Sequence, residues 1–316
     1  MKENYYRPCC PAYTNFGDLQ TVLQTAEVVR LTDTMLEKVF HEKSFADQYT
    51  YGAKISELYA ETLITESGIA KSHQRPLIIL DNACGTGSIS STLQRTLDER
   101  NKRSLKLTCG DLSEGMVDYT KQRMQAEGWN NAEAKIVNAQ DTGLPSDHYT
   151  HVYTAFAFNM FPDYKAALRE CLRILQPGGT LATSTWKTAN WCTIMKPVIA
   201  TMPGQLSYPT MDEINTMLNK GWDRESDVRA EFEQAGFDHV NITTVEKQCL
   251  LPVQEFGEAC KILLPYILSK FWTQEQRDQY EADVPSYLMR YLEREYGKDG
   301  LAPMKGVAII ASGRKP

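Results

Sequence analysis

The sequence predicts an α/β protein built on a mostly parallel β-sheet with helices packed against it. Two observations carry this expectation. Short apolar stretches of strand length alternate with longer amphipathic stretches over residues 77–186. The first apolar stretch breaks directly into the glycine-rich turn DNACGTG and then into a helix-like segment, as a buried parallel strand does. Strands joined by helices of this length are parallel and connected by right-handed crossovers.

The composition agrees with a folded protein of this class. Hydrophobic residues make up 42% and charged residues 23% of the 316 positions, which argues against a disordered or low-complexity chain. At roughly 150 residues per domain, the length allows two ordinary domains or one enlarged α/β domain. The motifs described below favour one sheet with helical additions before and between its strands.

Charge and cysteine usage exclude several classes of function. The chain carries 34 basic and 40 acidic side chains, a net charge of −6, which argues against a nucleic acid or an anionic membrane surface as partner. No apolar run is long enough to span a membrane, and the polar start MKENYYRPCC predicts no secretion signal. The eight cysteines form no C-x-x-C pair and have no histidine at metal-ligand spacing. We therefore expect a cytoplasmic, reduced protein without a metal site.

The elements of the first half follow in order. Residues 1–72 are expected to be helical, with apolar positions at helical spacing around residues 19–31 and 53–64 and a stop at Gly68. A helix is predicted from Ser88, and Ser113 and Asp163 are predicted to cap two further helices. The strands predicted between them are residues 76–81, 104–111, 132–139, 150–158 and 180–186.

The second half adds helices and two strands. The segment 189–221 carries no strand pattern, and a helix is predicted to end at Gly236 before a strand over 239–250. One long helical tract is predicted over 253–296, with a capping box at Thr273 and Gln276, and a closing strand follows over 306–313.

The glycine turn is the strongest local signal for a ligand. Ala83, Gly85 and Gly87 are small enough for a tight turn whose backbone can approach a ligand, and no G-K-[ST] follows that would make a phosphate loop. Asp111 ends the next strand, 24 residues after Gly87, near the spacing of about 20 at which an acid reaches a ribose hydroxyl. Together these features predict a nucleoside-bearing cofactor at the carboxyl ends of the strands.

Five segments then resemble a known family: D-x-A-C-G-T-G, GDLSEGM, VNAQDTGLP, YTAFAFNMFPD and LRILQPGGTLATSTW. Their order is similar to the motifs of class I S-adenosylmethionine-dependent methyltransferases, with the specific likeness over residues 77–186. The resemblance implies a Rossmann-like sheet of seven strands with the last strand antiparallel. It also implies an N-terminal helical lid over residues 1–72 and a methyltransferase domain over 73–316. Helical cap insertions are expected at about 189–236 and 253–304.

The resemblance also implies S-adenosyl-L-methionine as cofactor, S-adenosyl-L-homocysteine as product, and a role for each motif residue. Asp81, Ala83, Gly85 and Gly87 would line the methionine end, and Asp111 would hold the ribose hydroxyls. The remaining cofactor contacts are expected from Leu112 and Met116 beside the adenine, Asn138 and Ala139 at its amine edge, and Ala155 and Phe156 near the sulfonium. Asn138 departs from the family, where many members have Asp. Tyr49 either covers the cofactor or is an ordinary aromatic of the helix core.

No residue is a convincing general base. His73, His148, His151 and His239 precede or begin strands, which places them at the wrong end of a parallel sheet, and His41 is expected on a helix surface. Asn159 and Met160 follow the fourth strand and Trp186 ends the fifth, so we expect these three to position the substrate. Aromatic and apolar residues of the insertions are expected to form mostly the core of a cap, with a minority lining the pocket: Tyr208, Trp222, Phe256, Leu263, Tyr266, Phe271 and Trp272.

The missing base favours an acceptor that ionises easily, such as a small-molecule thiol with a pKa of about 8.5. The flanking segments KSFADQYTYG and FWTQEQRDQYEAD are similar to fungal secondary-metabolite bis-thiomethyltransferases, which implies S-methylation of a reduced, gliotoxin-type dithiodiketopiperazine. N- or O-methylation of another metabolite, and a regulatory protein that binds the cofactor without methylating, remain the alternatives.

Overall fold

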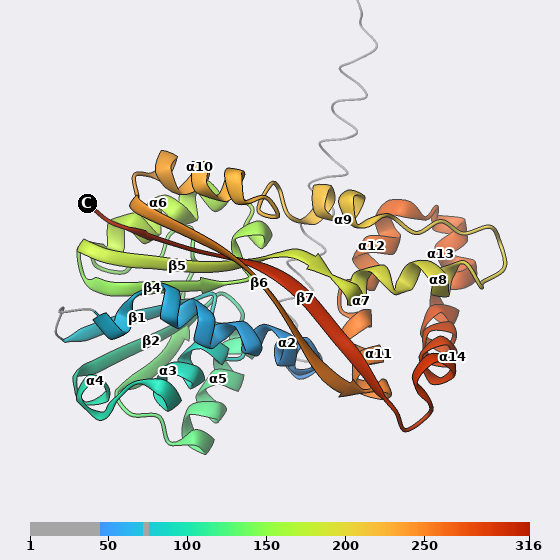
Figure 1. The fold of residues 1–316 in the computed structure, drawn as a ribbon, viewed down its shortest axis with the longest axis horizontal. Helices are drawn as coiled ribbons and strands as arrows, with labels where there is room; N and C mark the ends of the chain where they lie inside the picture. The colour runs from blue at the N-terminus through green and yellow to red at the C-terminus, as the bar shows by residue number, and fades with distance from the viewer. Residues whose placement is uncertain (1–44, 72–75) are drawn as a thin grey trace, which may run out of the picture.

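The architecture is one seven-stranded sheet with helices on both faces and a helical cap at one end (Figure 1). It comes from a computed structural model that describes residues 45–71 and 76–316. The helix predicted around residues 19–31, most of the predicted lid, and the histidines at positions 41 and 73 therefore lie outside the described residues.

The strand order is β3-β2-β1-β4-β5-β7-β6. Strands β1 to β5 pair in parallel, and β7 runs antiparallel to both β5 and β6, as the resemblance implies. The strands are β1 (Leu77–Asn82), β2 (Leu105–Asp111), β3 (Ala132–Ile136), β4 (Tyr149–Ala155), β5 (Leu175–Ala189), β6 (Asp238–Pro252) and β7 (Leu301–Arg314).

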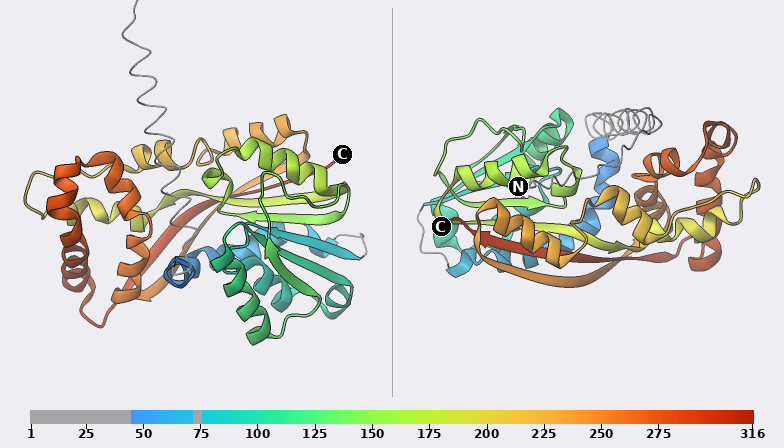
Figure 2. Two further views of the ribbon diagram at one scale, coloured as in Figure 1. Left: turned by 180° about the vertical axis from the view of Figure 1, so that it is seen from behind. Right: turned by 90° about the horizontal axis from the view of Figure 1, so that it is seen from above.

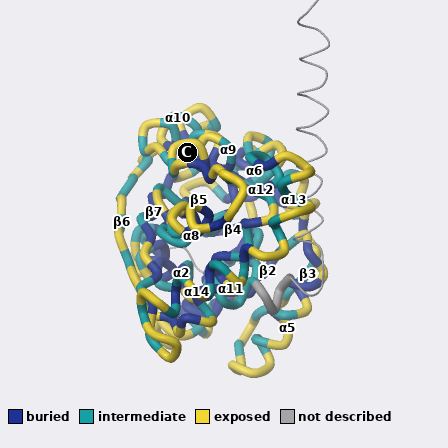
Figure 3. Tube along the Cα trace, turned by 90° about the vertical axis from the view of Figure 1, so that its right-hand side faces the viewer, coloured by how far each residue is buried: buried dark blue, intermediate teal, exposed yellow. Residues whose placement is uncertain are grey.

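Two buried cores lie on opposite faces of the sheet because successive strand residues point to opposite sides. Ile79 and Ile310 belong to the core under the N-terminal helices, whereas Leu80 and Ile309 belong to the core on the other face. The first face carries α2 (Phe45–Glu66), α3 (Ser88–Thr96), α4 (Glu99–Ser104) and α5 (Glu114–Glu127), and the second carries α6 (Tyr164–Ile174) and α10 (Glu225–Ala235). Figure 3 shows the sheet interior buried and the outer strand β6 partly exposed along its length.

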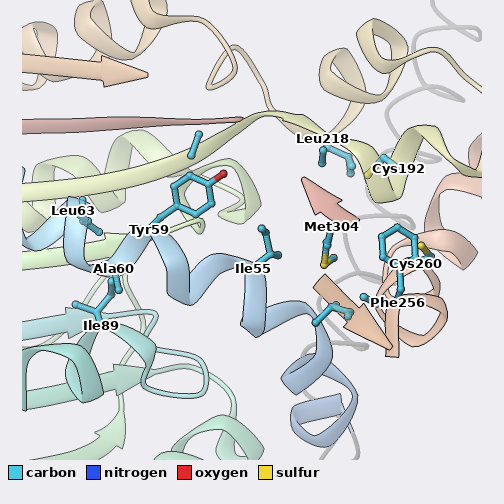
Figure 4. Close-up of a cluster of buried hydrophobic side chains, with 14 of the residues drawn as sticks. Ile55, Tyr59, Ala60, Leu63, Ile89, Cys192, Leu218, Phe256, Cys260 and Met304 are labelled. Atoms are coloured by element: carbon cyan, nitrogen blue, oxygen red, sulfur yellow. The ribbon is translucent and has the colours of Figure 1, made fainter. Parts of the chain in front are cut away.

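The cap packs on the ends of β6 and β7, which extend beyond the other strands of the sheet (Figure 2). β7 pairs with β6 from its first residue, Leu301 against Pro252, well beyond the last β5 partner at Gly306. The cap helices are α7 (Asn190–Thr193), α8 (Met195–Ile199), α9 (Met211–Leu218), α11 (Val253–Lys261), α12 (Leu264–Phe271), α13 (Gln274–Tyr280) and α14 (Val284–Tyr296). The first core continues from α2 into this cap through Ile55, Met304 and Phe256 (Figure 4).

The tract over 253–296 is helical as predicted, and it is divided into four separate α-helices. Pro265 and Pro285 each stand in the first turn of a new helix, where their missing N–H costs nothing but where a preceding helix cannot continue through them. The capping box at Thr273 and Gln276 starts a third helix, as predicted. α10 also differs from its expected place in the cap, since it packs beside α6 on the sheet.

The other residues predicted to begin or end helices are found at helix ends. Ser113 accepts a hydrogen bond from the amide of Met116, and Asp163 accepts one from the amide of Ala166. α2 ends shortly before Gly68, and α10 ends at Gly236 in the left-handed conformation. No helix within 45–71 and 76–316 combines the length and the apolar character that a bilayer crossing requires.

Candidate functional site

A cavity of about 330 Å³ opens at the carboxyl ends of β1, β2, β4 and β5, where ligands bind in doubly wound sheets. This volume falls within the range of roughly 300–1,000 Å³ typical of small-molecule sites. The glycine turn and the ends of β2 and β3 form one side. The ends of β4 and β5, together with α7, α9, α11 and α12 of the cap, form the other. We call these the cofactor side and the acceptor side.

The glycine turn presents open backbone to the cofactor side. Ala83 and Gly85 line the cavity, and both have a φ of +53°, a left-handed conformation that favours residues without bulk. A Cβ added at Gly85 would meet only the ring of Tyr49, 3.9 Å away, so that position borders open space. Tyr49 itself lines the cavity, which agrees with the first of the two roles considered for it. Burial raises the pKa of its hydroxyl to about 12, with the nearby Asp111 adding to the shift, so the group stays neutral.

Gly87 and Asp81, two residues expected at the methionine end, do not line the cavity. A Cβ at Gly87 would lie 3.0 Å from Trp129 and 3.3 Å from Thr120, so this glycine allows the turn to pack against neighbouring side chains. Asp81 is buried behind the turn, where its Oδ2 accepts hydrogen bonds from the amide and the hydroxyl of Ser90 at 3.1 and 2.6 Å. Burial raises its pKa to about 7, although the Ser90 donors act against the shift. In this structure both residues therefore lie behind the turn and support it.

Asp111 joins the turn to the end of β2. Its Oδ2 accepts from the amide of Gly85 at 2.8 Å and its Oδ1 from the amide of Ser113 at 2.9 Å. These two bonds hold the carboxylate at the end of β2, where Asp111 lines the cavity.

The structure brings the expected adenine contacts to the same side. Leu112, Met116, Asn138 and Ala139 all line the cavity. Asn138 Oδ1 accepts from the amide of Gln140 at 3.0 Å, which orients the side chain at the end of β3. This arrangement fits S-adenosylmethionine. The open backbone at Gly85 suits the amino-acid part, the Asp111 carboxylate suits the ribose, and the apolar walls beyond it suit the adenine.

The acceptor side begins with an aromatic wall. Ala155, Phe156 and Trp186 line the cavity at the ends of β4 and β5, and the rings of Phe156 and Trp186 stack at 4.1 Å. Phe156 has a φ of +55°, a strained conformation for a bulky residue and one that is concentrated at functional sites. Tyr59 of α2 contacts both rings edge-on, and Trp191 of α7 contacts Trp186 edge-on at 4.9 Å.

Asn159 and Met160, the other predicted positioning residues, also line the acceptor side, from the short helix η2 (Phe158–Met160). Of the seven insertion residues named from the sequence, Leu263 and Tyr266 line the cavity and the other five do not. Sequence reasoning missed several acceptor-side residues, because short helices and turns carry no recognisable periodicity: Trp191, Cys192, Met211, Ile214, Asn215, Met217, Asn219 and Lys220.

The ionisable groups of the described lining are few. Asp111 is the only carboxylate among them, and no described histidine lines the cavity. His148 and His239 stand at the amino ends of β4 and β6, and His151 is buried within β4, where its Nδ1 lies 3.0 Å from the hydroxyl of Thr150. The Cys192 thiol lines the acceptor side, and burial raises its pKa to about 12.

Comparison with known proteins shows clear relatives. Residues 79–179 match the family described as "Methyltransferase domain". The chain is 52% identical to Methyltransferase ktnA of Aspergillus niger, over 87% of this chain and 97% of that protein. It is 45% identical to the acetylaranotin bis-thiomethyltransferase of Aspergillus terreus, over 89% and 98% respectively. Phosphoethanolamine N-methyltransferase 2 of Haemonchus contortus in complex with S-adenosyl-L-methionine shares the fold, with a TM-score of 0.53 at 13% identity, covering 90% of this chain and 60% of that one.

Proposed function

Because this chain belongs to the class I S-adenosylmethionine-dependent methyltransferases of fungal secondary metabolism, we propose that it methylates the thiols of a small metabolite, a reduced dithiodiketopiperazine. One observation carries the choice of acceptor. Of the two curated relatives reported above, the acetylaranotin bis-thiomethyltransferase is the one whose name states the acceptor group, and the likeness to it extends over 89% of this chain, so it includes the cap that forms the acceptor side as well as the cofactor motifs. The likeness to Methyltransferase ktnA extends over 87% of the chain, but that name states no acceptor.

The cofactor side supplies binding and orientation. We assign the ribose hydroxyls to Asp111, the adenine to the space between Leu112 and Met116, and the amino-acid end to the backbone at Ala83 and Gly85. Asn138 and Ala139 would meet the amine edge of the adenine. Bound S-adenosylmethionine supplies an electrophilic methyl group on its sulfonium. Ala155 and Phe156 stand where the cofactor side meets the acceptor side, so this is where we place the transfer.

The acceptor side supplies alignment and excludes water. Methyl transfer is an in-line displacement, and its rate depends on holding the nucleophile on the axis of the breaking bond. The stacked rings of Phe156 and Trp186 and the cap residues Leu263 and Tyr266 form apolar walls suited to a flat, uncharged molecule.

Deprotonation makes a small demand on this site if the acceptor is a thiol. Asp111 is held by two backbone amides at the cofactor side, and the raised pKa of Cys192 keeps its thiol protonated. A substrate thiol with a pKa of about 8.5 is already several per cent thiolate at neutral pH, whereas an alcohol is not. The described lining therefore suits a thiol better than an aliphatic hydroxyl.

The test is product analysis with the full-length protein, S-adenosylmethionine and a chemically reduced dithiodiketopiperazine. We expect S-adenosylhomocysteine together with mono- and bis-methylthio products, detected by mass spectrometry. A phenol and a primary amine serve as competing acceptors. Faster turnover of either of these would overturn the thiol assignment in favour of O- or N-methylation. Cofactor binding without S-adenosylhomocysteine formation on any acceptor would indicate a regulatory protein instead.

A further inference from the structure

Three buried asparagine side chains form a continuous hydrogen-bonded chain along the acceptor side. Asn159 Nδ2 donates to Asn219 Oδ1 at 3.2 Å, and Asn219 Nδ2 donates to Asn215 Oδ1 at 2.8 Å. All three line the cavity and are between 5% and 9% exposed. A polar chain of this kind is costly to bury unless every member is satisfied, so its arrangement is strongly constrained.

Main-chain carbonyls fix the direction of every amide in the chain. Asn215 Nδ2 donates to the carbonyl of Lys187 at 3.1 Å, and Asn219 Nδ2 also donates to the carbonyl of Trp186 at 3.2 Å. These carbonyls lie where the register between β5 and β7 shifts, between Trp186 and Thr188. A carbonyl can only accept, so neither amide can be reversed without losing a bond.

The same logic fixes Asn159, which ends the chain. Its Nδ2 has two hydrogens, and the acceptors within reach are Asn219 Oδ1, the carbonyl of Leu218 at 3.3 Å and the weakly accepting Met160 Sδ at 3.6 Å. Its Oδ1 accepts no hydrogen bond from the described residues. This oxygen is not fully enclosed by neighbouring atoms. Because Asn159 lines the cavity, a ligand there can reach it.

We propose that Asn159 Oδ1 is a specificity-determining acceptor that binds a neutral hydrogen-bond donor of the substrate next to the reacting atom. The inference rests on the proposed function and deepens it. For a diketopiperazine dithiol, the donor is the N–H of the ring nitrogen bonded to the thiol-bearing carbon, or a hydroxyl on the substituent of that carbon. Asn159 Oδ1 can only accept a hydrogen bond, and the Nδ2 hydrogens of the same amide are already donated, so a carboxylate or phosphate group would find no donor on Asn159.

Asn219 then acts as a positioning residue. It ties Asn159 to the backbone of Trp186, whose ring belongs to the aromatic wall, so the polar acceptor and the apolar wall keep a constant relation. If Asn219 were removed, Asn159 would keep the bond from its Nδ2 to the Leu218 carbonyl but lose the one to Asn219, so its amide would be held less firmly in the orientation that presents Oδ1.

The first test needs no variant. Wild-type enzyme is assayed with three reduced dithiols: one with free ring N–H groups, its N,N′-dimethyl counterpart, and an N,N′-dimethyl compound that carries a hydroxymethyl group. We expect the compound that provides the donor to have a KM about tenfold lower than the N,N′-dimethyl compound. A tenfold change in affinity corresponds to the free energy of one well-placed hydrogen bond. The N–H and hydroxymethyl compounds separate the two sources of donor. Equal KM values for all three would overturn the proposal.

Variants then assign the effect to the chain of asparagines. In Asn159→Leu and in Asn219→Leu the KM ratio between donor-free and donor-bearing compounds should fall toward one. Asn241→Leu, an exposed change on β6, should keep the wild-type ratio. Cofactor affinity and the melting curve check that each variant is folded. An unchanged ratio in folded Asn159→Leu would also overturn the proposal.

Failure of the thiol assignment gives a different result. If the enzyme methylates phenols and no dithiol, the proposed function is wrong, and the comparison is repeated with catechol and its monomethyl ether. A KM ratio that depends on Asn159 in that pair would support the donor-binding role independently of the thiol. A ratio that does not depend on it would refute the role.

Discussion

Gly306 of β7 gives the sharpest test of how the acceptor side is built. A Cβ at this position would lie 2.6 Å from Cζ3 of Trp186 and 3.3 Å from the hydroxyl of Tyr59. Non-bonded carbons rest at about 3.5–4.0 Å, so in Gly306→Ala the Trp186 ring must move by roughly 1 Å. That ring stacks on Phe156 at 4.1 Å, and its displacement shifts the aromatic wall of the cavity.

The expected costs can be separated by assay. Overpacking of this kind destabilises a protein by about 1–3 kcal/mol, which urea unfolding measures. A misplacement of ~1 Å beside the reacting atoms can lower turnover up to about a hundredfold, so we expect kcat/KM for the acceptor to fall by tenfold or more. The affinity for S-adenosylmethionine, measured by calorimetry, should change by less than about twofold, because the three atoms nearest the added methyl group belong to Trp186 and Tyr59 and not to Ala83, Gly85 or Asp111.

Gly313 of the same strand provides the matched control. A Cβ there would lie 2.8 Å from Cδ1 of Phe232 and 3.0 Å from Cβ of Phe237, a comparable clash on the opposite core and away from the cavity. Gly313→Ala should therefore lose similar stability while kcat/KM stays near wild type. If both variants lose acceptor turnover equally, or if Gly306→Ala loses none, the aromatic wall does not position the substrate as described.

Three further changes test other parts of the structure. Asp111→Ala should weaken S-adenosylmethionine binding at least tenfold, since hydrogen bonds to a charged acceptor contribute about 1.5–3 kcal/mol each. As a control, His148→Ala, a substitution at an exposed position, should leave turnover unchanged. Normal cofactor affinity in Asp111→Ala would show that this carboxylate does not bind the cofactor. Burial raises the Asp81 pKa from 3.8 to about 7, so the folded protein binds this proton more tightly than the unfolded chain does. The stabilisation, roughly 4 kcal/mol at 1.36 kcal/mol per pKa unit, is complete below about pH 4 and is lost as the pH rises through about 7. Urea unfolding of Asp81→Asn from pH 4 to 8 should show a flatter profile than wild type, and an identical profile would contradict the assignment. Thr273→Ala removes the hydroxyl that accepts from the amide of Gln276 in the capping box of α13 and should cost about 1 kcal/mol in the same unfolding assay, whereas an unchanged midpoint would show that α13 does not depend on this cap.

Local signals predicted the central sheet well. The turn after residue 81, the caps at Ser113 and Asp163 and the left-handed stop at Gly236 are determined by a few neighbouring residues, and each appears as expected. The strands β5, β6 and β7 are longer than predicted. At the cap end the extensions are made by pairing between these strands, for example Ala189 with Gly306 and Pro252 with Leu301, and β5 also begins earlier, where Leu175 pairs with Tyr149 of β4.

In the site, too, some features were predictable from motif position and others depended on the fold. Motif positions placed Asp111, Asn138 and Phe156 on the cavity because strand ends meet at one edge of a parallel sheet. The motif could not separate Gly85, which borders open space, from Gly87, which packs against Trp129 and Thr120. The surroundings of each glycine are set by the fold: the amide of Gly85 donates to Asp111, whereas Gly87 is the N-cap of α3.

By itself, therefore, the sequence determined the cofactor half of this protein, because a glycine turn followed by an acid at the next strand end is read within a short stretch of chain. On the acceptor half, the sequence placed Asn159 and Trp186 at strand ends, and tertiary structure decided what stands beside them. Asn215 and Asn219 come from a separate segment, and only the folded cap brings their amides to Asn159 and to the main-chain carbonyls of Trp186 and Lys187. Such contacts depend on distance in space, which periodicity and spacing along the chain do not encode.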